Sequence, residues 1–533
     1  MSKKGEILKN RFGKLAGTRA NWEQHWEEIA KFILPKKDDV YGSRNKGEKK
    51  GQALYDSTAI HSNELLASAL HSMLTNPSLQ FFGLSTGDKK LDKNDKVRKW
   101  LQDVVDIMHD VMNNSNFQTQ IHEVYVDLGS FGTSVLRIEE DEKDLVRFHS
   151  RPIYESYIKE NSRGIVDTVY RTFTWEVRKI IQQWGVESLP NDIQKELKMD
   201  SGIELKEFEI VHSVEPRDDL LRDKRFGPLS PQGKAISSIY WIRQSGHVLK
   251  EEGFNEFPYA VPRWTKISSE IYGRSPGMKS LPDIKMLNEV MRVQIRGAQK
   301  AIDPAVQIPD DGFHRTVRLY PGGINHYRAG TNDKIEPINV NPRIDLGQVF
   351  MDDIRIRIKQ AYFADQLQLR EGPQMTATEV RQRTEEQLRL LGPILGRQHN
   401  ELLKPLVERV YGILLRKNMF PVPPQELSGF DLKVNYVSQI AKAQKASEAD
   451  NLLRVLQSVA PLIEFDPTIM DNIDSDEAFL HAADMFDLPQ ELITSDKEKK
   501  EIRGQRAKQQ QQQQQQEQNL AEAETVQKLG GAQ

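Results

Sequence analysis

The sequence predicts an α+β protein that is predominantly helical. Apolar residues recur at helical spacing over long stretches at both ends of the chain. Between them, from about Phe131 to Phe254, lie short segments rich in Val, Ile, Tyr, Phe and Thr, which are typical of strands. At 533 residues the chain is long enough for about two to four domains, so a sizeable core is expected.

The composition is that of an ordinary soluble protein, with 38% hydrophobic and 28% charged residues. No apolar run approaches the roughly 18 residues that a membrane span needs. The basic start Met1-Ser2-Lys3-Lys4-Gly5 is not followed by the apolar segment of a secretory signal. We therefore expect neither a membrane segment nor secretion.

Cysteine usage and charge exclude further classes. The sequence has no cysteine, which excludes disulfides, thiolate metal sites and cysteine nucleophiles. Lys plus Arg number 74 and Asp plus Glu 77, a formal charge of −3. Because this balance provides no global attraction to phosphate, any contact with DNA must be local or weak.

Helices joined by short breaks are predicted over the first hundred residues. One covers Trp22 to Leu34 and stops at Pro35, and a third covers about Asp95 to Asn113. The second opens at Asp56-Ser57-Thr58, where Asp56 or Ser57 can cap it, and ends at Asn76-Pro77. The basic, glycine-containing segment Lys36 to Lys50 fits either a solvated linker or a loop that contacts phosphate.

Two turn signals divide the strand-like region. Glu160-Asn161-Ser162-Arg163-Gly164 separates a Tyr/Ile run from the segment 165–170, and Ser245-Gly246 separates 239–242 from 247–249. Small and turn-forming residues between two apolar runs predict β-hairpins at both places.

The remaining half of the chain is again mainly helical by pattern. A helix is predicted from Pro276 to about Ala301, then a Pro/Gly-punctuated stretch over 303–342, then a helix from about Leu346 to Phe363. The longest run, Thr378 to about Asn418, is interrupted by Gly392-Pro393, Gly396 and Pro405, which predicts a kinked or stepped helix.

The C-terminal part is predicted to be helical from Val434 to Ile493. Beyond Lys497 the sequence is Lys/Glu-rich and then runs as uninterrupted glutamine from Gln509 to Gln516. This tail has almost no core-forming residues. It is predicted to be disordered, or helical only when packed against a neighbouring copy.

Catalytic motifs are absent or fail on chemical grounds. The sequence contains neither a phosphate-binding Gly-x-x-x-x-Gly-Lys-Ser/Thr motif nor His-Glu-x-x-His. Gly273-Arg274-Ser275-Pro276-Gly277 matches the nucleophile elbow of α/β-hydrolases, but Pro276 lacks the backbone N–H that would bind an oxyanion. We interpret this segment as a helix start, with Ser275 as the cap and Pro276 in the first turn.

One helix carries a basic stripe. Lys285, Arg292, Arg296 and Lys300 recur at spacings that place them near one face of the helix predicted over 276–301. The helix over 346–363 adds Arg355, Arg357 and Lys359, diluted by Asp352 and Asp353. A solvated helix face and a face turned toward DNA both fit this pattern.

Three stretches resemble the head-to-tail connector, or portal, proteins of short-tailed bacteriophages. The first is Tyr272-Gly273-Arg274-Ser275-Pro276 running into 281–288, which resembles the start of the stem in that family. The second is Met375-Thr376-Ala377-Thr378-Glu379-Val380 with Arg381 and Arg383, and the third is Tyr55-Asp56-Ser57-Thr58-Ala59 leading to 79–82. The resemblance covers about residues 15 to 430.

The resemblance implies a portal-type fold with a wing, a helical stem, a small α/β clip, a long kinked spine helix and a helical C-terminal crown. The implied parts are a wing over 1–275, a first stem helix over 276–301, a clip over 302–345, a second stem helix over 346–363, a tunnel loop over 364–376, a spine helix and return to the wing over 377–433, a crown over 434–496 and a tail over 497–533. The residues then expected to line a DNA channel are Lys285, Arg292, Arg296, Lys300, Arg355, Lys359, Gln366, Gln368 and Arg370.

The resemblance also implies partners. It predicts a homo-oligomeric ring of twelve subunits in the virion, at the head-tail vertex of the capsid, assembled in the host cytoplasm. Duplex DNA would pass through this ring during packaging and ejection, with no enzymatic activity, cofactor, metal or membrane involved. A terminase large subunit that supplies ATP hydrolysis would dock at the clip and tail adaptor proteins would follow it there, while scaffolding and major capsid proteins would contact the wing.

Two other functions stay open on the residues alone. A tail-tube or adaptor structural protein would also lack catalytic motifs, although such proteins are usually shorter. An uncharacterised metal-dependent hydrolase that uses scattered carboxylates is compatible with the composition.

Overall fold

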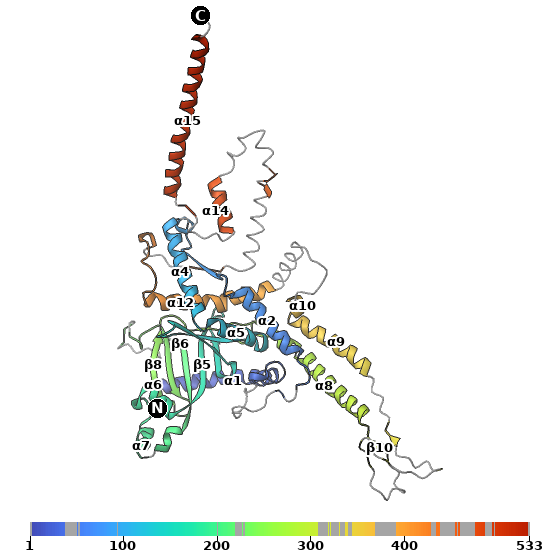
Figure 1. Ribbon diagram of the computed structural model, residues 1–533. Helices are drawn as coiled ribbons and strands as arrows, with labels where there is room; N and C mark the ends of the chain where they lie inside the picture. Colours follow the sequence, from blue (N-terminus) through green and yellow to red (C-terminus); the bar gives the residue numbers. More distant parts are fainter. Residues whose placement is uncertain are drawn as a thin grey trace. The chain divides into compact units, whose positions relative to one another are not determined.

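The computed structural model of the chain (Figure 1) describes most of the N-terminal half and selected parts of the rest. The described residues are 3–37, 51, 54–92, 94–199, 201–218, 226–227, 230–307, 318, 320, 324, 330, 336–338, 344–367, 391–427, 433–436, 454–455, 457–458, 475–485, 493–494 and 496–530. Two compact units are formed, one by Met1–Phe81 with Met108–Met419 and the other by Phe82–Ile107 with Phe420–Gln533. Among the described helices, none combines the length and the apolar character needed to cross a membrane.

The first unit contains helices at the positions predicted around 22–34, 58–74, 276–301 and 346–363, and further helices that were not predicted. Its helices are α1 Lys3–Phe32, α2 Thr58–Leu74, α5 Phe117–Phe131, α6 Val177–Trp184, α7 Asn191–Met199, α8 Pro276–Ile302, α9 Ile344–Ala361, α10 Ala364–Leu367 and α12 Lys404–Arg416, while α4 Asp95–Asn114 runs from the second unit into the first. Short 3₁₀ turns occupy Pro35–Lys37, Ile153–Glu155, Val186–Ser188, Ser201–Leu205 and Gln425–Leu427.

The first helix is longer than predicted. We expected it to begin near Trp22, but α1 begins at Lys3, because Leu8, Phe12 and Leu15 already form a buried stripe at helical spacing. The cap of α2 is as predicted for Asp56, whose Oδ1 accepts a hydrogen bond from the Thr58 backbone N–H at 2.8 Å. Ser57, the other predicted cap, makes no side-chain capping bond.

A five-stranded antiparallel sheet forms the β-rich part of the first unit. Its spatial order is β4 Ser156–Glu160, β5 Val166–Glu176, β6 Glu207–Pro216, β7 Ile236–Ile242 and β8 Val248–Phe254. The two predicted hairpins are confirmed, since β4 pairs with β5 and β7 pairs with β8. The prediction of strands throughout 131–254 is wrong at 177–184 and 191–199, where α6 and α7 use apolar residues at helical spacing to cover part of the sheet.

The two faces of this sheet have different coverings, because successive side chains of a strand point to opposite faces. Tyr170, Val211 and Trp241 lie on the face that packs against Leu8 and Phe12 of α1. On the other face, Ile210, Ile242 and Leu249 pack with residues of α6 and α7. The sheet is therefore sandwiched between helices that lie far apart in the sequence (Figure 1).

A smaller three-stranded sheet follows α5. It has the order β3 Val146–Arg151, β2 Val135–Glu140 and β9 Tyr259–Ala260, with antiparallel pairing throughout. Phe131, predicted as the start of the strand region, instead ends α5, and Gly132 caps that helix in the left-handed conformation with φ of 74°. Helix α5 packs against both β2 and β3 and against α2.

The start of α8 is fixed to the end of α5 by close backbone contacts. The Gly273 backbone N–H donates to Thr133 Oγ1 at 2.8 Å, and the Ser275 hydroxyl donates to the Ser130 carbonyl at 2.6 Å. A Cβ on Gly132 would lie 2.5 Å from the Gly273 carbonyl oxygen. Only glycine therefore satisfies both the positive φ and the short separation at Gly132.

Arg263 joins three further segments. Its side chain is 1% exposed and binds both carboxylate oxygens of Glu401, at 3.0 Å from Nε and 2.6 Å from Nη2. It also pairs with Glu160 and donates to the Gly164 carbonyl at 3.0 Å, both in the β4–β5 hairpin. Burial lowers the pKa of Arg263, but the carboxylates of Glu401 and Glu160 raise it above its ordinary value overall.

Glu401 lies in an irregular turn of the long C-terminal helix of this unit. Residues 391–398 are α-helical, His399–Leu403 forms a π-helical turn, and α12 continues from Lys404 to Arg416. The interruption predicted from Gly396 and Pro405 is therefore a π-helical turn within a continuous helix. The predicted start of this helix at Thr378 lies outside the described residues.

The second unit contains β1 Phe82–Ser85, α3 Lys89–Asp92, β12 Lys433–Tyr436, α14 Ser475–Met485 and α15 Asp496–Gly530. The helix predicted from Val434 is wrong at its start, because 433–436 pairs as an antiparallel strand with β1. This partner lies about 350 residues earlier, and the pairing overrides local preference. The tail was predicted to be disordered, or helical only against a neighbouring copy; in this single chain it is the helix α15, and its side chains from 500 to 516 are exposed.

The structure differs from the predictions at two other short segments, one at Lys37 and one at Ala364. Lys37 belongs to the segment predicted as a solvated linker or a phosphate-contacting loop, but it bonds to the buried Asp127 at 2.6 Å and to Glu123 at 3.2 Å and so anchors the end of α1 to α5. Residues 38–50 lie outside the described part. The polar loop expected to start at Ala364 opens with the short helix α10, and its remainder after Leu367 is also outside the described residues.

We predict that Arg263→Met strongly destabilises the first unit. The change leaves two largely buried carboxylates without their main partner, at a cost of about 3 kcal/mol. Arg147→Met removes a 49%-exposed arginine from an ion pair on β3 and should cost less than about 1 kcal/mol. Thermal unfolding of both purified variants checks this, and equal shifts in melting temperature would refute a central role for Arg263.

A matched pair of glycine variants separates conformational strain from steric clash. Gly132 and Gly164 share φ of 74°, but a Cβ on Gly164 would meet only the Lys266 Nζ at 3.6 Å. Gly164→Ala should cost about 1–2 kcal/mol from the left-handed conformation alone. Gly132→Ala should cost about 1–3 kcal/mol more, because the backbone must move. Melting temperatures measure the difference, and equal values would show that the α5–α8 junction yields freely.

Candidate functional site

The two predicted helices that flank the Pro/Gly-rich stretch form an antiparallel pair, α8 and α9 (Figure 1). Asp283 near the start of α8 pairs with Arg357 near the end of α9 at 3.6 Å. At the other end, a Cβ on Gly347 of α9 would meet the side-chain amide of Gln294 of α8. Between the helices the described residues include the short antiparallel pair β10 Val306–Gln307 and β11 Glu336–Pro337.

Helix α8 begins at the Gly-x-Ser-x-Gly motif, as predicted. Ser275 Oγ accepts a hydrogen bond from the Met278 N–H at 2.9 Å, and Pro276 occupies the first turn. The Ser275 side chain is 4% exposed, and its hydroxyl proton is directed to the Ser130 carbonyl. This serine is a helix cap and a contact to α5, in agreement with the rejection of a nucleophile elbow.

The inner faces of the pair are apolar. Leu281, Ile284 and Leu287 of α8 are buried, as are the α9 residues Met351, Ile354 and Ile358. The α9 residues are spaced by three and four, which gives one continuous stripe. Helix α9 packs against both α8 and α2, so the pair is attached to the body at its base.

The segment before α2 attaches both helices through its backbone and one carboxylate. The Tyr55 N–H donates to Asn288 Oδ1 of α8 at 2.7 Å, and Asp56 Oδ2 accepts from Arg355 Nη2 of α9 at 2.9 Å. Burial raises the pKa of Asp56, but hydrogen bonds from Thr58 and Arg355 lower it below its ordinary value overall. The Tyr55-Asp56-Ser57-Thr58 motif therefore has a structural role at the base of the helix pair.

Three of the cations predicted to line a channel are engaged in ion pairs. Lys285 Nζ lies 2.7 Å from Glu28 of α1, Arg292 lies 2.5 Å from Glu289, and Arg355 binds both Asp56 and Asp352 at 2.9 Å. Lys285 and Arg292 remain about two-fifths exposed. Their charge is therefore available at the surface but partly balanced.

Arg296, Lys300 and Lys359 are exposed and make no ion pair with another described residue. They lie toward the outer end of α8 and on the solvent side of α9. Gln366 is half-buried in α10. Gln368 and Arg370, the other predicted channel residues, lie outside the described part of the chain.

The helix pair also exposes apolar side chains that the sequence analysis did not single out. Met286 and Val293 of α8 are 38% and 57% exposed, and Val349 and Ile356 of α9 are 71% and 53% exposed. Ile295 and Ile302 of α8 and Phe350 of α9 are exposed as well, so exposed apolar side chains occur on more than one side of each helix. The sequence contained a sign of this exposure, because these apolar residues fall outside the periodic apolar stripe that is buried in each helix.

The described residues hold no group of three or more His, Asp or Glu side chains placed to bind a metal ion. His314 and His326, which flank the sequence Tyr320-Pro321-Gly322-Gly323, lie outside the described part.

A mixed α+β body that carries an antiparallel helix pair with exposed apolar and cationic surfaces has the features of an assembly subunit. Comparison with known proteins identifies the family. Residues 6–493 match the family described as bacteriophage head to tail connecting protein. The chain therefore belongs to this family.

Three similar proteins are named as portal proteins. The chain is 33% identical to the probable portal protein of Bordetella phage BPP-1, over 98% of this chain and 95% of that protein. It is 30% identical to the portal protein of Salmonella phage epsilon15, over 99% and 96%. It is 22% identical to the portal protein of Enterobacteria phage T3, over 43% and 46%.

Proposed function

We propose that this protein is the portal of a bacteriophage, which forms a closed ring of twelve copies at the head-tail vertex of the capsid. Duplex DNA passes through the ring during packaging and ejection. The observation that carries this proposal is the relation to two named portal proteins over nearly the whole length of each chain. The exposed apolar residues of α8 and α9 support it, because a ring places a neighbouring copy on this surface.

The parts of the chain take the following roles in this proposal. The wing is residues 1–275, the stem is 276–301 and 346–363 on the helix pair, the clip is 302–345, the tunnel loop is 364–376, the spine is 377–433, the crown is 434–496 and the tail is 497–533. The terminase large subunit and later the tail adaptors dock at the clip, and scaffolding and major capsid proteins contact the wing. The protein itself is non-catalytic, and the energy for packaging comes from the terminase.

The charge pattern of the stem suits a channel in which DNA slides. Each phosphate that a cation neutralises adds salt-dependent affinity, so many free cations would hold the duplex in place. Pairing of Lys285 with Glu28 and of Arg292 with Glu289 weakens two of these contacts. Arg296 and Lys300 then provide the stronger contacts near the clip end of α8. Sequence-independent phosphate contact is expected, without recognition of bases.

Electron microscopy and native mass measurement test the proposal directly. We expect closed rings with a central opening wide enough for duplex DNA and a mass that is a whole multiple of the subunit. A single monomeric species in all conditions would overturn the proposal. Turnover of duplex DNA or casein with added divalent metal, abolished by one carboxylate substitution, would overturn the non-catalytic assignment.

Substitution of the exposed apolar residues should block ring formation. In Val349→Asp with Ile356→Asp, two carboxylates replace apolar side chains at the proposed contact with the next subunit, and their desolvation opposes association. The matched control is Met199→Asp on α7, where the native side chain is 89% exposed. Native mass measurement should show rings for the control and unassembled subunits for the double variant. Rings of normal stability in the double variant would exclude this face from the interface.

Removal of Arg296 and Lys300, two cations of α8 that make no ion pair with a described residue, should reduce DNA packaging without preventing assembly. Arg296→Gln with Lys300→Gln removes two positive charges per subunit, so each ring loses many phosphate contacts. The control, Arg178→Gln with Lys179→Gln, removes the same charges from the exposed side of α6. We expect the DNA content per particle to fall several-fold only in the α8 variant. Equal DNA content in both would show that Arg296 and Lys300 are simply solvated.

A further inference from the structure

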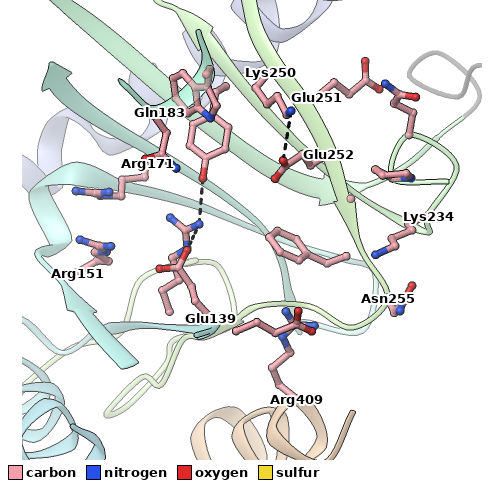
Figure 2. Close-up of a pocket in the computed structure, with 18 of the residues that line it drawn as sticks. Glu139, Arg151, Arg171, Gln183, Lys234, Lys250, Glu251, Glu252, Asn255 and Arg409 are labelled. Atoms are coloured by element: carbon pink, nitrogen blue, oxygen red, sulfur yellow. Dashed lines mark hydrogen bonds and ion pairs between the residues drawn. The ribbon is translucent and has the colours of Figure 1, made fainter. Parts of the chain in front are cut away.

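A cavity of about 690 Å³ lies in the first unit on the face of the five-stranded sheet opposite α1 (Figure 2). Residues of β5, β7 and β8 form one wall, and the rest comes from β2, the end of β3, α6, the segment 231–234, Asn255 and α12. Its size is within the range of sites that take a small ligand or a few residues of a peptide. The helix pair is not part of it.

Three arginines meet at one end of this cavity. Arg171 Nε is 2.8 Å from Glu155, and Arg137 pairs with Glu139 and donates to the Tyr240 hydroxyl at 3.0 Å. Arg151 makes no ion pair with a described residue, and its enclosed Nε has no hydrogen-bond partner among them. Figure 2 shows Arg151 and Arg171 together at one side of the cavity.

This cationic end is only partly neutralised, because Arg171 and Arg137 are ion-paired but Arg151 is not. Burial lowers the pKa of Arg151, and the charges of Arg171 and Arg137 lower it further. The Nε of Arg137, a residue that is 7% exposed, also lacks a partner among the described residues. An unpaired buried donor on a cation is costly, so a bound anionic group would relieve both the repulsion and the missing hydrogen bonds.

An aromatic wall adjoins the arginines. Phe173 and Trp175 have ring centroids 4.9 Å apart, Trp175 and Trp184 5.4 Å, and Trp184 and Tyr240 4.7 Å. All four rings are half-buried and line the cavity. Trp, Tyr and Arg together are the side chains that contribute most to protein recognition sites.

The charge of the whole lining indicates the kind of ligand. Seven lysine or arginine side chains and four glutamates line the cavity, a net formal charge of +3 for these residues. A nucleic acid strand or a polyphosphate carries a continuous row of anionic groups that would meet the four glutamates as well as the arginines, which disfavours it relative to a ligand with isolated carboxylates. A carboxylate next to an apolar or aromatic side chain fits the arginine end and the aromatic wall. The amides of Gln183 and Asn255 can then pair with a peptide backbone.

We propose that this cavity binds a short acidic and aromatic peptide segment of a partner protein, with a carboxylate of the segment on Arg151 and an aromatic side chain on Trp175 and Trp184. This inference goes beyond the portal function and does not depend on ring formation. It makes Arg151 a binding residue whose guanidinium makes no ion pair with another described residue.

The test uses the full-length protein and four probes. They are a capped peptide of alternating Asp and Phe, the same peptide with Asn in place of Asp, inorganic phosphate and AMP. Calorimetric titration should show saturable binding of the Asp peptide only, weakened by salt. Arg151→Gln should reduce its affinity about tenfold or more, since a charge-assisted hydrogen bond is lost, and Arg151→Lys should retain part of it. Arg147→Gln, an exposed arginine on the same strand that does not line the cavity, is the matched control.

Stability provides an independent readout. Because Arg151 is repelled by two neighbouring arginines, Arg151→Gln should keep or raise the melting temperature while it loses peptide binding. A lower melting temperature with unchanged peptide affinity would show a purely structural arginine and overturn the proposal. Absence of binding of the Asp peptide to the wild type, or binding of AMP or phosphate in its place with the same dependence on Arg151, would also overturn it.

Discussion

The buried Arg263 is the interaction on which the arrangement of the first unit depends. A guanidinium that is 1% exposed must have its donors satisfied, and here Glu401, Glu160 and two backbone carbonyls accept from it. These acceptors come from the long C-terminal helix, the β4–β5 hairpin and the segment that leads into α8. Because an unpaired charge at this depth is expensive, the three segments hold one relative position. The π-helical turn at His399–Leu403 contains Glu401, so the irregular turn has a structural purpose.

The same constraint bears on the helix pair. Helix α8 starts only a few residues after Ile271, whose carbonyl accepts from Arg263 at 3.1 Å, and Gly132 and Gly273 bring its first turn against α5. The pair leaves the body from a fixed base and presents cations and apolar side chains along its length. In the proposed ring, the apolar faces would be covered by neighbouring copies. The partly paired cations would face DNA, with affinity low enough for movement.

The sequence predicted the elements that depend on local pattern. The bounds of α2, α4, α8 and α9, the Asp56 and Ser275 caps and both hairpins follow from residues close together in the chain. The predictions failed where contacts between segments that are distant in the sequence determine the local structure. The strand 433–436 exists because of β1, and Lys37 is an anchor because Asp127 is buried beside it. Among the predicted channel residues, Lys285, Arg292 and Arg355 are paired in the structure, and this could not be read from spacing along one helix.

The sequence by itself determined the mixed, mainly helical class, the helix pair around a Pro/Gly-rich stretch and, through three short motifs, the resemblance to phage connector proteins. Helical periodicity, caps and turns are encoded within a few residues, which is why these features can be predicted locally. Only the tertiary structure decided which carboxylate meets Arg263, which stem cations are balanced and that Arg137, Arg151 and Arg171 share one cavity. Burial and charge pairing are properties of segments brought together from far apart, so their energies are set by the fold and not by sequence spacing.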